Sequence, residues 1–135
     1  MGTEAIETTI STGTLRGSVT DGIRRFLGIP YAAPPFGSRR FRLPAAPDAW
    51  VGVRDATQFG PSAPQTPYRG RIGELLPSLT SDGTNEDILT VNVWAPTDAT
   101  DPASGPLPVV LWIHGGAFER GGRSIAGDDG TRFAR

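Results

Sequence analysis

The residues whose types and spacing could do chemistry are concentrated in one segment, Trp112-Ile113-His114-Gly115-Gly116-Ala117-Phe118. An apolar run leads into two glycines and an alanine, and backbone without large side chains can turn successive amide N–H groups toward one point. Amides arranged in this way stabilise the negative charge that develops on a carbonyl oxygen during acyl transfer. A glycine pair after a strand is also a common turn, so the segment alone leaves both interpretations open.

Three motifs place this segment in a wider pattern. They are Phe26–Gly37 (FLGIPYAAPPFG), followed by Arg40-Phe41-Arg42 and Trp50; Asn85–Pro96 (NEDILTVNVWAP); and Pro108–Phe118 (PVVLWIHGGAF). In order and approximate spacing, over roughly residues 8 to 130, the motifs resemble those of the type-B carboxylesterases, the cholinesterase-like family of α/β-hydrolases.

The resemblance implies an α/β fold and hydrolysis of a small-molecule carboxylic ester by a serine, histidine and Glu/Asp triad, with no cofactor. It makes Gly116 and Ala117 the amide donors of an oxyanion hole, with Gly115 shaping the turn. It also implies a structural salt bridge between Arg40 and Glu86. The alternative for these two charges is that both are exposed and solvated.

The nucleophile and the base of such a triad are not found in this sequence. No Gly-x-Ser-x-Gly motif occurs, and the nearest stretch, Gly122-Arg123-Ser124-Ile125-Ala126, lacks the final glycine and a preceding apolar strand. We therefore interpret Ser124 as structural. In α/β-hydrolases the histidine follows the nucleophile and the acid, so the single histidine, His114, is interpreted as a residue that braces the loop by bonding nearby backbone. The chain alone is expected to be inactive.

The chain contains no cysteine, in contrast to many members of the family. Ile88 stands where they have the cysteine of Glu-Asp-Cys, and Ala63 stands where they have an earlier cysteine after Phe-Gly-Pro. Both halves of the family's first disulfide are thus absent together, which fits a reducing compartment or a bacterial lineage. The first ten residues carry Glu4 and Glu7 and no apolar run, so no signal peptide is predicted. We expect a cytoplasmic protein, and secretion stays open.

The other candidates for chemistry favour structural roles. Trp50, Trp94 and Trp112 could line an acyl pocket, but tryptophans in or beside strands more often pack in a core. The carboxylates occur as adjacent pairs, Glu86-Asp87 and Asp128-Asp129, and not as a spaced acid/base dyad or a ligand cage. With one histidine and no cysteine, no metal site is predicted.

Charge and hydropathy exclude two classes of partner. The net charge is −1 and the basic residues are dispersed, which argues against nucleic acid. The longest apolar run, Val109–Ile113, is far shorter than the ~20 residues that a membrane-spanning helix needs.

The elements that must position the site begin with short antiparallel strands. Strands are predicted at Glu4–Ile10, Gly13–Arg16 and Ile23–Leu27, with a tight hairpin at Asp21-Gly22. The proline-rich stretch Gly28–Pro47 is expected to be neither a central strand nor a helix. A second polar span, Gly60–Thr84, is expected to hold only a short helix at Arg71–Leu76.

Two further strands and the start of a helix follow. Ile88–Trp94 suits a half-buried strand, and Leu107–Ile113 is a continuous apolar run typical of a strand buried on both faces. Gly127–Arg135 resembles the opening of a helix, with Asp128 or Asp129 as N-cap. No long amphipathic helix is available to cover such a sheet, so the chain is predicted to be unfinished.

These patterns predict an α/β chain that forms the N-terminal part of an α/β-hydrolase domain and is incomplete. The expected divisions are 1–30 as an antiparallel β-meander, 31–84 as rim loops, 85–118 as central-sheet strands with the oxyanion loop, and 119–135 as a loop and the start of a helix.

The predicted function is a fragment of a serine esterase that works through an acyl-enzyme and supplies only the oxyanion hole. Three alternatives stay open: a catalytically dead, cholinesterase-like binding module, a truncated or decayed reading frame, and one half of a split enzyme whose second chain supplies serine, acid and histidine. Exposed apolar surface at Val109–Ile113, with a tendency to aggregate, is also expected.

Overall fold

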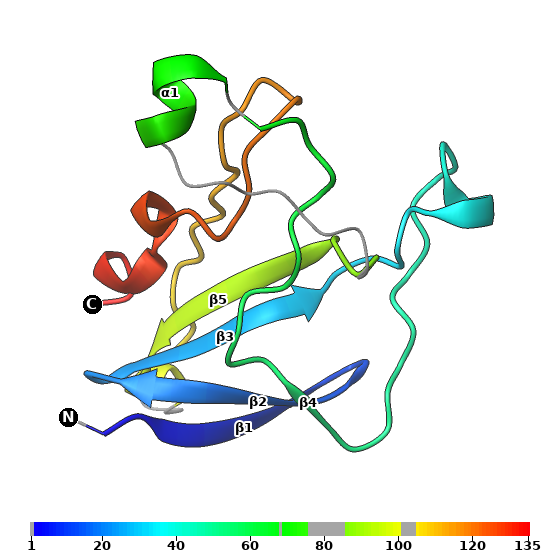
Figure 1. Cartoon of the computed structure of the whole chain (residues 1–135). Coiled ribbons are helices and arrows are strands. Elements are labelled where there is room, and N and C mark those ends of the chain that lie inside the picture. Colours follow the sequence, from blue (N-terminus) through cyan, green and yellow to red (C-terminus); the bar gives the residue numbers. More distant parts are fainter. Residues whose placement is uncertain (1, 68, 76–85, 101–104) are drawn as a thin grey trace.

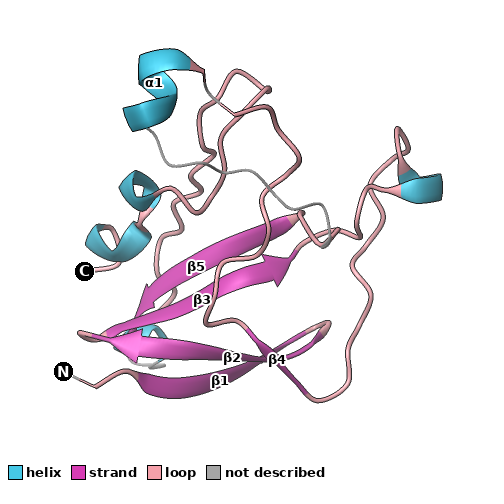
Figure 2. Ribbon diagram, in the orientation of Figure 1, coloured by secondary structure: helices cyan, strands magenta, loops and turns pink. Residues whose placement is uncertain are grey.

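One mixed sheet organises the chain. A computed structural model describes residues 2–67, 69–75, 86–100 and 105–135. Within these residues five strands form a sheet in the order β1-β2-β3-β5, and β4 pairs with β2 outside that path (Figure 1, Figure 2). The strands are β1 Glu4–Ile10, β2 Gly13–Thr20, β3 Ile23–Pro30, β4 Val53–Asp55 and β5 Thr90–Pro96. The helical elements among the described residues are α1 Gly70–Leu75 and the 3₁₀ turns η1 Gly37–Arg39, η2 Thr97–Thr100, η4 Ala126–Asp128 and η5 Gly130–Arg132.

The first three strands form the predicted β-meander. β1 and β2 pair antiparallel from Glu4 opposite Val19 to the end of β1. In the turn between β2 and β3, Asp21 and Gly22 both have positive φ, 52° and 75°, as a type I′ hairpin turn requires. The predicted hairpin is confirmed, and β2 and β3 both extend further than the sequence indicated.

β4 replaces β3 along the first half of β2. Ser18–Thr20 of β2 pairs with β3, whereas Thr14–Arg16 pairs with β4 in the parallel direction. Ala56 closes the junction, because its N–H donates to the carbonyl of Arg16 at 2.8 Å and its own carbonyl accepts from the N–H of Leu27 at 2.7 Å. Backbone groups that would be orphaned where two strands diverge are thereby paired.

The hydrophobic core lies at this junction. Leu15, Phe26 and Ala56 form the buried cluster, and three partly buried side chains pack against it: Ile6, Ile29 and Trp50. Burying one large apolar side chain contributes about 1.5–3 kcal/mol. Four further described hydrophobic residues are buried outside this cluster: Ile23, Leu27, Ala32 and Ala33.

β3 continues through Gly28 by means of an irregularity. Its pairing with β5 shifts register between Phe26 and Ile29, as in a β-bulge, and Gly28 has a φ of 69°. The expectation that Gly28–Pro47 contributes nothing to a central strand is therefore wrong for residues 28–30, which belong to β3. Glycine makes this possible, because it adopts positive φ without steric cost.

The predicted strand Leu107–Ile113 is not formed. The segment has no regular secondary structure, and residues 109–113 are 67–91 % exposed. A strand buried on both faces needs neighbouring strands and helices, and no described residue pairs with this segment. The expected exposure of Val109–Ile113 is confirmed, whereas the strand itself is a wrong prediction for this chain.

One of the two predicted helices is found and the other is replaced by shorter turns. α1 agrees with the prediction up to Leu75, and Leu76, like the rest of the span up to Thr84, lies outside the described residues. Instead of one helix after Gly127 there are two 3₁₀ turns, with Asp129 as the N-cap of the second. Among the described residues, no helix is long and apolar enough to cross a membrane.

Candidate functional site

The segment Gly115–Phe118 adopts a backbone conformation that L-residues rarely take. Gly116 has a φ of 133°, and the two following residues, Ala117 and Phe118, have φ values of 56° and 60°. A residue with a side chain costs about 1–2 kcal/mol in the left-handed region. Strain of this kind in a loop is a recognised mark of a functional position.

The amide N–H groups of this segment are available to a ligand. None of the backbone N–H groups of residues 115–118 donates a hydrogen bond to another described residue. The loop is instead closed by the carbonyl of Gly116, which accepts from the N–H groups of Glu119 and Arg120, both at 3.0 Å. Consecutive unpaired amides in left-handed or turn backbone form an anion-binding concavity.

Gly116 cannot be replaced without moving the loop. A Cβ built on this residue would lie 1.8 Å from the carbonyl oxygen of Arg120, well inside van der Waals contact. The positive φ of Gly116 adds a second reason for glycine. Gly115, by contrast, has open space around the position of a Cβ.

The imidazole of His114 contacts the same loop. Its Nδ1 lies 2.8 Å from the carbonyl oxygen of Gly115, and because a carbonyl can only accept, Nδ1 must carry the proton in this contact. The ring also lies beside Gly121, whose Cβ would meet Nδ1 at 2.8 Å. The contact with nearby backbone is the one that the sequence interpretation anticipated.

Three polar side chains fasten the segment that follows the loop. Gln65 forms two hydrogen bonds with the backbone of Gly121, each of 2.9 Å. The guanidinium of Arg123 donates to the carbonyls of Pro61, at 3.0 Å, and Ile88, at 3.3 Å, and Asn92 donates to the carbonyl of Arg123 at 3.0 Å. Burial lowers the pKa of Arg123, an effect that the charges of Tyr31 and Asp87 oppose.

Sequence reasoning missed these three residues. Asn92 did carry a signal, because it is an amide inside an otherwise apolar strand, and a buried amide needs a hydrogen-bond partner. Gln65 and Arg123 carried none, since their partners are backbone groups of segments distant in sequence.

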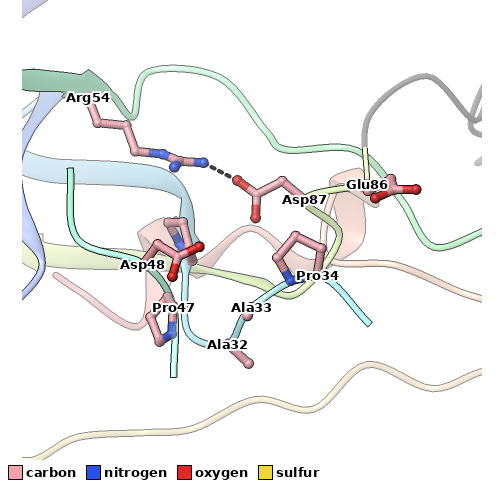
Figure 3. A pocket seen from close by; sticks show the side chains of 9 residues that line it. Ala32, Ala33, Pro34, Pro47, Asp48, Arg54, Glu86 and Asp87 are labelled. Carbon is pink, nitrogen blue, oxygen red and sulfur yellow. Dashed lines mark hydrogen bonds and ion pairs between the residues drawn. The ribbon is translucent and has the colours of Figure 1, made fainter. Parts of the chain in front are cut away.

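The structure does not bring Arg40 and Glu86 together. The Arg40 guanidinium lies over the ring of Phe41, 5.0 Å from its centroid, and Glu86 is exposed. The ion pair formed beside Glu86 joins its sequence neighbour Asp87 to Arg54. In Figure 3 the Asp87 carboxylate faces Arg54, whereas that of Glu86 is turned away from it.

A hollow of about 330 Å³ lies next to this ion pair (Figure 3). Its walls are prolines and alanines from the end of β3 and the following loop, with Asp48, Arg54, Glu86 and Asp87 as the charged residues. No group of three or more His, Cys, Asp or Glu residues in the described part of the chain could hold a metal ion.

The tryptophans differ in role. Trp50 packs on the core and donates from Nε1 to the carbonyl of Thr14 at 2.9 Å, and the ring of Trp94 packs against Gly130 of η5. Both are structural in this chain, whereas Trp112 is 67 % exposed. Ser124 is half-buried.

Comparison with known proteins decides the family. The sequence model of the carboxylesterase family matches residues 4–135. The chain belongs to the carboxylesterase family. As a carboxylesterase chain, it resembles the N-terminal part of α/β-hydrolase esterases, so the suspected family and fold class are confirmed.

Several of its relatives are named as esterases. The chain is 40 % identical over 124 residues to para-nitrobenzyl esterase of Bacillus subtilis (strain 168), covering 90 % of this chain and 23 % of the relative. It is 39 % identical over 119 residues to fumonisin B1 esterase of Sphingopyxis macrogoltabida, covering 87 % and 20 %. A solved thermophilic PNB esterase superposes with a TM-score of 0.77 at 39 % identity, covering 95 % of this chain and 25 % of that one. The carboxylesterase chain thus spans between a fifth and a quarter of the length of these relatives.

Proposed function

We propose that this chain supplies the oxyanion hole of a serine carboxylic ester hydrolase through the amides of Gly116 and Ala117, with Gly115 shaping the turn. The observation that carries the proposal is the set of unpaired amides in positive-φ backbone at the family's Gly-Gly-Ala position. The esterase names of the relatives support a carboxylic ester as the substrate class.

The proposed reaction divides the work between segments. A serine hydroxyl attacks the ester carbonyl, and the two amides stabilise the oxygen as it becomes negative. The alcohol then leaves, and water hydrolyses the acyl-enzyme. Serine, acid and histidine would come from segments other than these 135 residues, in the same polypeptide or in a second chain, so the chain alone is proposed to be inactive.

Ester hydrolysis tests this proposal directly. Hydrolysis of a short-chain p-nitrophenyl ester is measured with the purified chain, and then with the chain mixed with the polypeptide encoded immediately downstream. We expect activity only in the mixture. Silence in both, with a folded chain, contradicts the proposal and favours a binding module or a gene remnant.

A pair of glycine variants assigns the activity to the loop. Gly116→Ala forces the loop away from the Arg120 carbonyl, and loss of one oxyanion donor lowers kcat by about 10²–10³ fold. Gly127→Ala is the matched control, because a Cβ there meets nothing within 4 Å. Equal activity of the two variants would remove Gly116 from the proposed site.

A further inference from the structure

The side chain of Gln65 forms hydrogen bonds with both the N–H and the carbonyl of Gly121. Its Oε1 accepts from the Gly121 N–H at 2.9 Å, and its Nε2 donates to the Gly121 carbonyl at 2.9 Å. A primary amide offers a donor and an acceptor side by side without charge. Nε2 also lies 3.2 Å from the carbonyl of Ala63, which fixes which end of the amide is the donor.

Gly121 lies directly against the base of the oxyanion loop. A Cβ on Gly121 would meet the carbonyl oxygen of Gly115 at 2.4 Å and the His114 ring at 2.8 Å. The backbone of Gly121 and that of Gly115 are therefore packed without intervening side chains. A shift of Gly121 would move Gly115, and with it the amides of Gly116 and Ala117.

The chain on the far side of Gly121 is already fixed. Arg123 is held by the carbonyls of Pro61 and Ile88, and its own carbonyl accepts from Asn92 on β5. These bonds anchor the residues after Gly121 to the sheet and to the rim loop, but they do not touch the loop itself. Gln65 alone of the three polar side chains reaches the residue that contacts Gly115.

We infer that Gln65 is a positioning residue that sets the orientation of the oxyanion amides through Gly121. For its catalytic consequence the inference rests on the proposed function. Its structural part, a link from Gln65 to Gly115–Phe118, can be tested on this chain by itself. Gln65 touches no reacting atom in this scheme.

The structural arm uses backbone amide NMR spectra of the 135-residue chain. Gln65→Leu removes both hydrogen bonds to Gly121, and Gln65→Glu keeps the acceptor but loses the donor. Gln58→Leu is the control, since Gln58 is exposed in the same rim segment. We expect Gln65→Leu to shift the resonances of residues 115–118 as well as Gly121 and to leave β1–β3 unchanged, with a smaller effect of Gln65→Glu. Unchanged resonances at 115–118 in both variants would overturn the inference.

The catalytic arm uses the mixture that hydrolyses the ester. Because misplaced oxyanion amides weaken transition-state binding, Gln65→Leu should lower kcat by about 10-fold and change KM by less than about twofold. In the Gly116→Ala background the same substitution should cost little, because the loop is already displaced. A full additional loss there would show that Gln65 acts elsewhere. If the wild-type mixture hydrolyses no ester, the proposed function fails, whereas shifts at residues 115–118 still support the link.

Discussion

The side chain of Asn92 on β5 accepts a hydrogen bond from the backbone N–H of Gly28 on β3 at 3.0 Å. Gly28 lies where the pairing of β3 with β5 shifts register, so its buried N–H has no ladder partner. The Oδ1 of Asn92 supplies the missing acceptor for this N–H, and its Nδ2 donates to the carbonyl of Arg123. One side chain therefore links β3 and β5 to the segment that follows the proposed oxyanion loop.

Removing this amide should destabilise the chain. Asn92→Leu leaves the Gly28 N–H and the Arg123 carbonyl unpaired, and a buried unsatisfied polar group costs about 1–3 kcal/mol. We expect the free energy of unfolding to fall by about 2 kcal/mol in urea titrations. Asn92→Asp, which keeps the acceptor for Gly28, should lose less than Asn92→Leu. Equal losses in the two variants would mean that the bond to Gly28 contributes nothing.

Substitutions at two glycines with similar φ distinguish the cost of steric crowding by a new Cβ from the cost of backbone strain. Gly28 and Gly22 have φ values of 69° and 75°, but a Cβ on Gly28 would lie 3.0 Å from the Gly60 nitrogen, whereas one on Gly22 meets nothing within 4 Å. Gly22→Ala should cost about 1 kcal/mol from backbone strain alone. Gly28→Ala should cost at least about 1 kcal/mol more, measured by the same urea titrations. A smaller loss at Gly28 than at Gly22 would contradict the crowding argument.

Local chemistry explains which parts of the fold the sequence predicted. Asp21-Gly22 encodes its own turn, and the flanking strands follow from it, because a two-residue hairpin fixes their register. The apolar run Leu107–Ile113 is typical of a strand that is buried on both faces. Burial also needs neighbouring strands and helices, which the run itself does not specify, and the predicted strand is absent. The contact between Gln65 and Gly121 spans 56 positions, and no periodicity or motif in a single sequence connects two loops at that distance. The glycines of the proposed oxyanion loop could be singled out because a glycine pair after an apolar run is itself a sequence signal.

The cap of η5 should make the stability of the chain sensitive to acid. Hydrogen bonding by Thr131 lowers the pKa of Asp129, with burial opposing it and Arg25 assisting. A depressed carboxylate pKa contributes stability above the unfolded value, about 3.9, and that stability is lost as pH falls through the folded value. Because Asp129 is exposed, the contribution should be below about 1 kcal/mol.

The substitution Asp129→Asn separates the contribution of the Asp129 charge from that of its hydrogen bond. Asp129→Asn keeps an oxygen that accepts from the Thr131 N–H, at 2.8 Å in the native chain, but it does not titrate. The difference in unfolding free energy between Asp129→Asn and the native chain should therefore shrink between about pH 5 and pH 3. Asp129→Ala, without any cap, should be the least stable of the three at pH 7. A pH-independent difference would exclude Asp129 as the titrating group.

The exposed run Val109–Ile113 should dominate self-association of the isolated chain. An exposed apolar run that pairs with no described strand offers another copy both a hydrophobic patch and unpaired backbone groups. Val110→Lys with Leu111→Lys should lower light scattering and binding of the dye ANS while leaving the unfolding free energy unchanged, since both side chains are mostly solvent-exposed. Val51→Lys is the control, because Val51 is fully exposed but stands outside the run. If Val51→Lys suppresses aggregation as strongly, net charge explains the effect and the run does not. In the mixture that tests the proposed function, the double variant should instead reduce ester hydrolysis, because we propose that the second polypeptide covers the run Val109–Ile113.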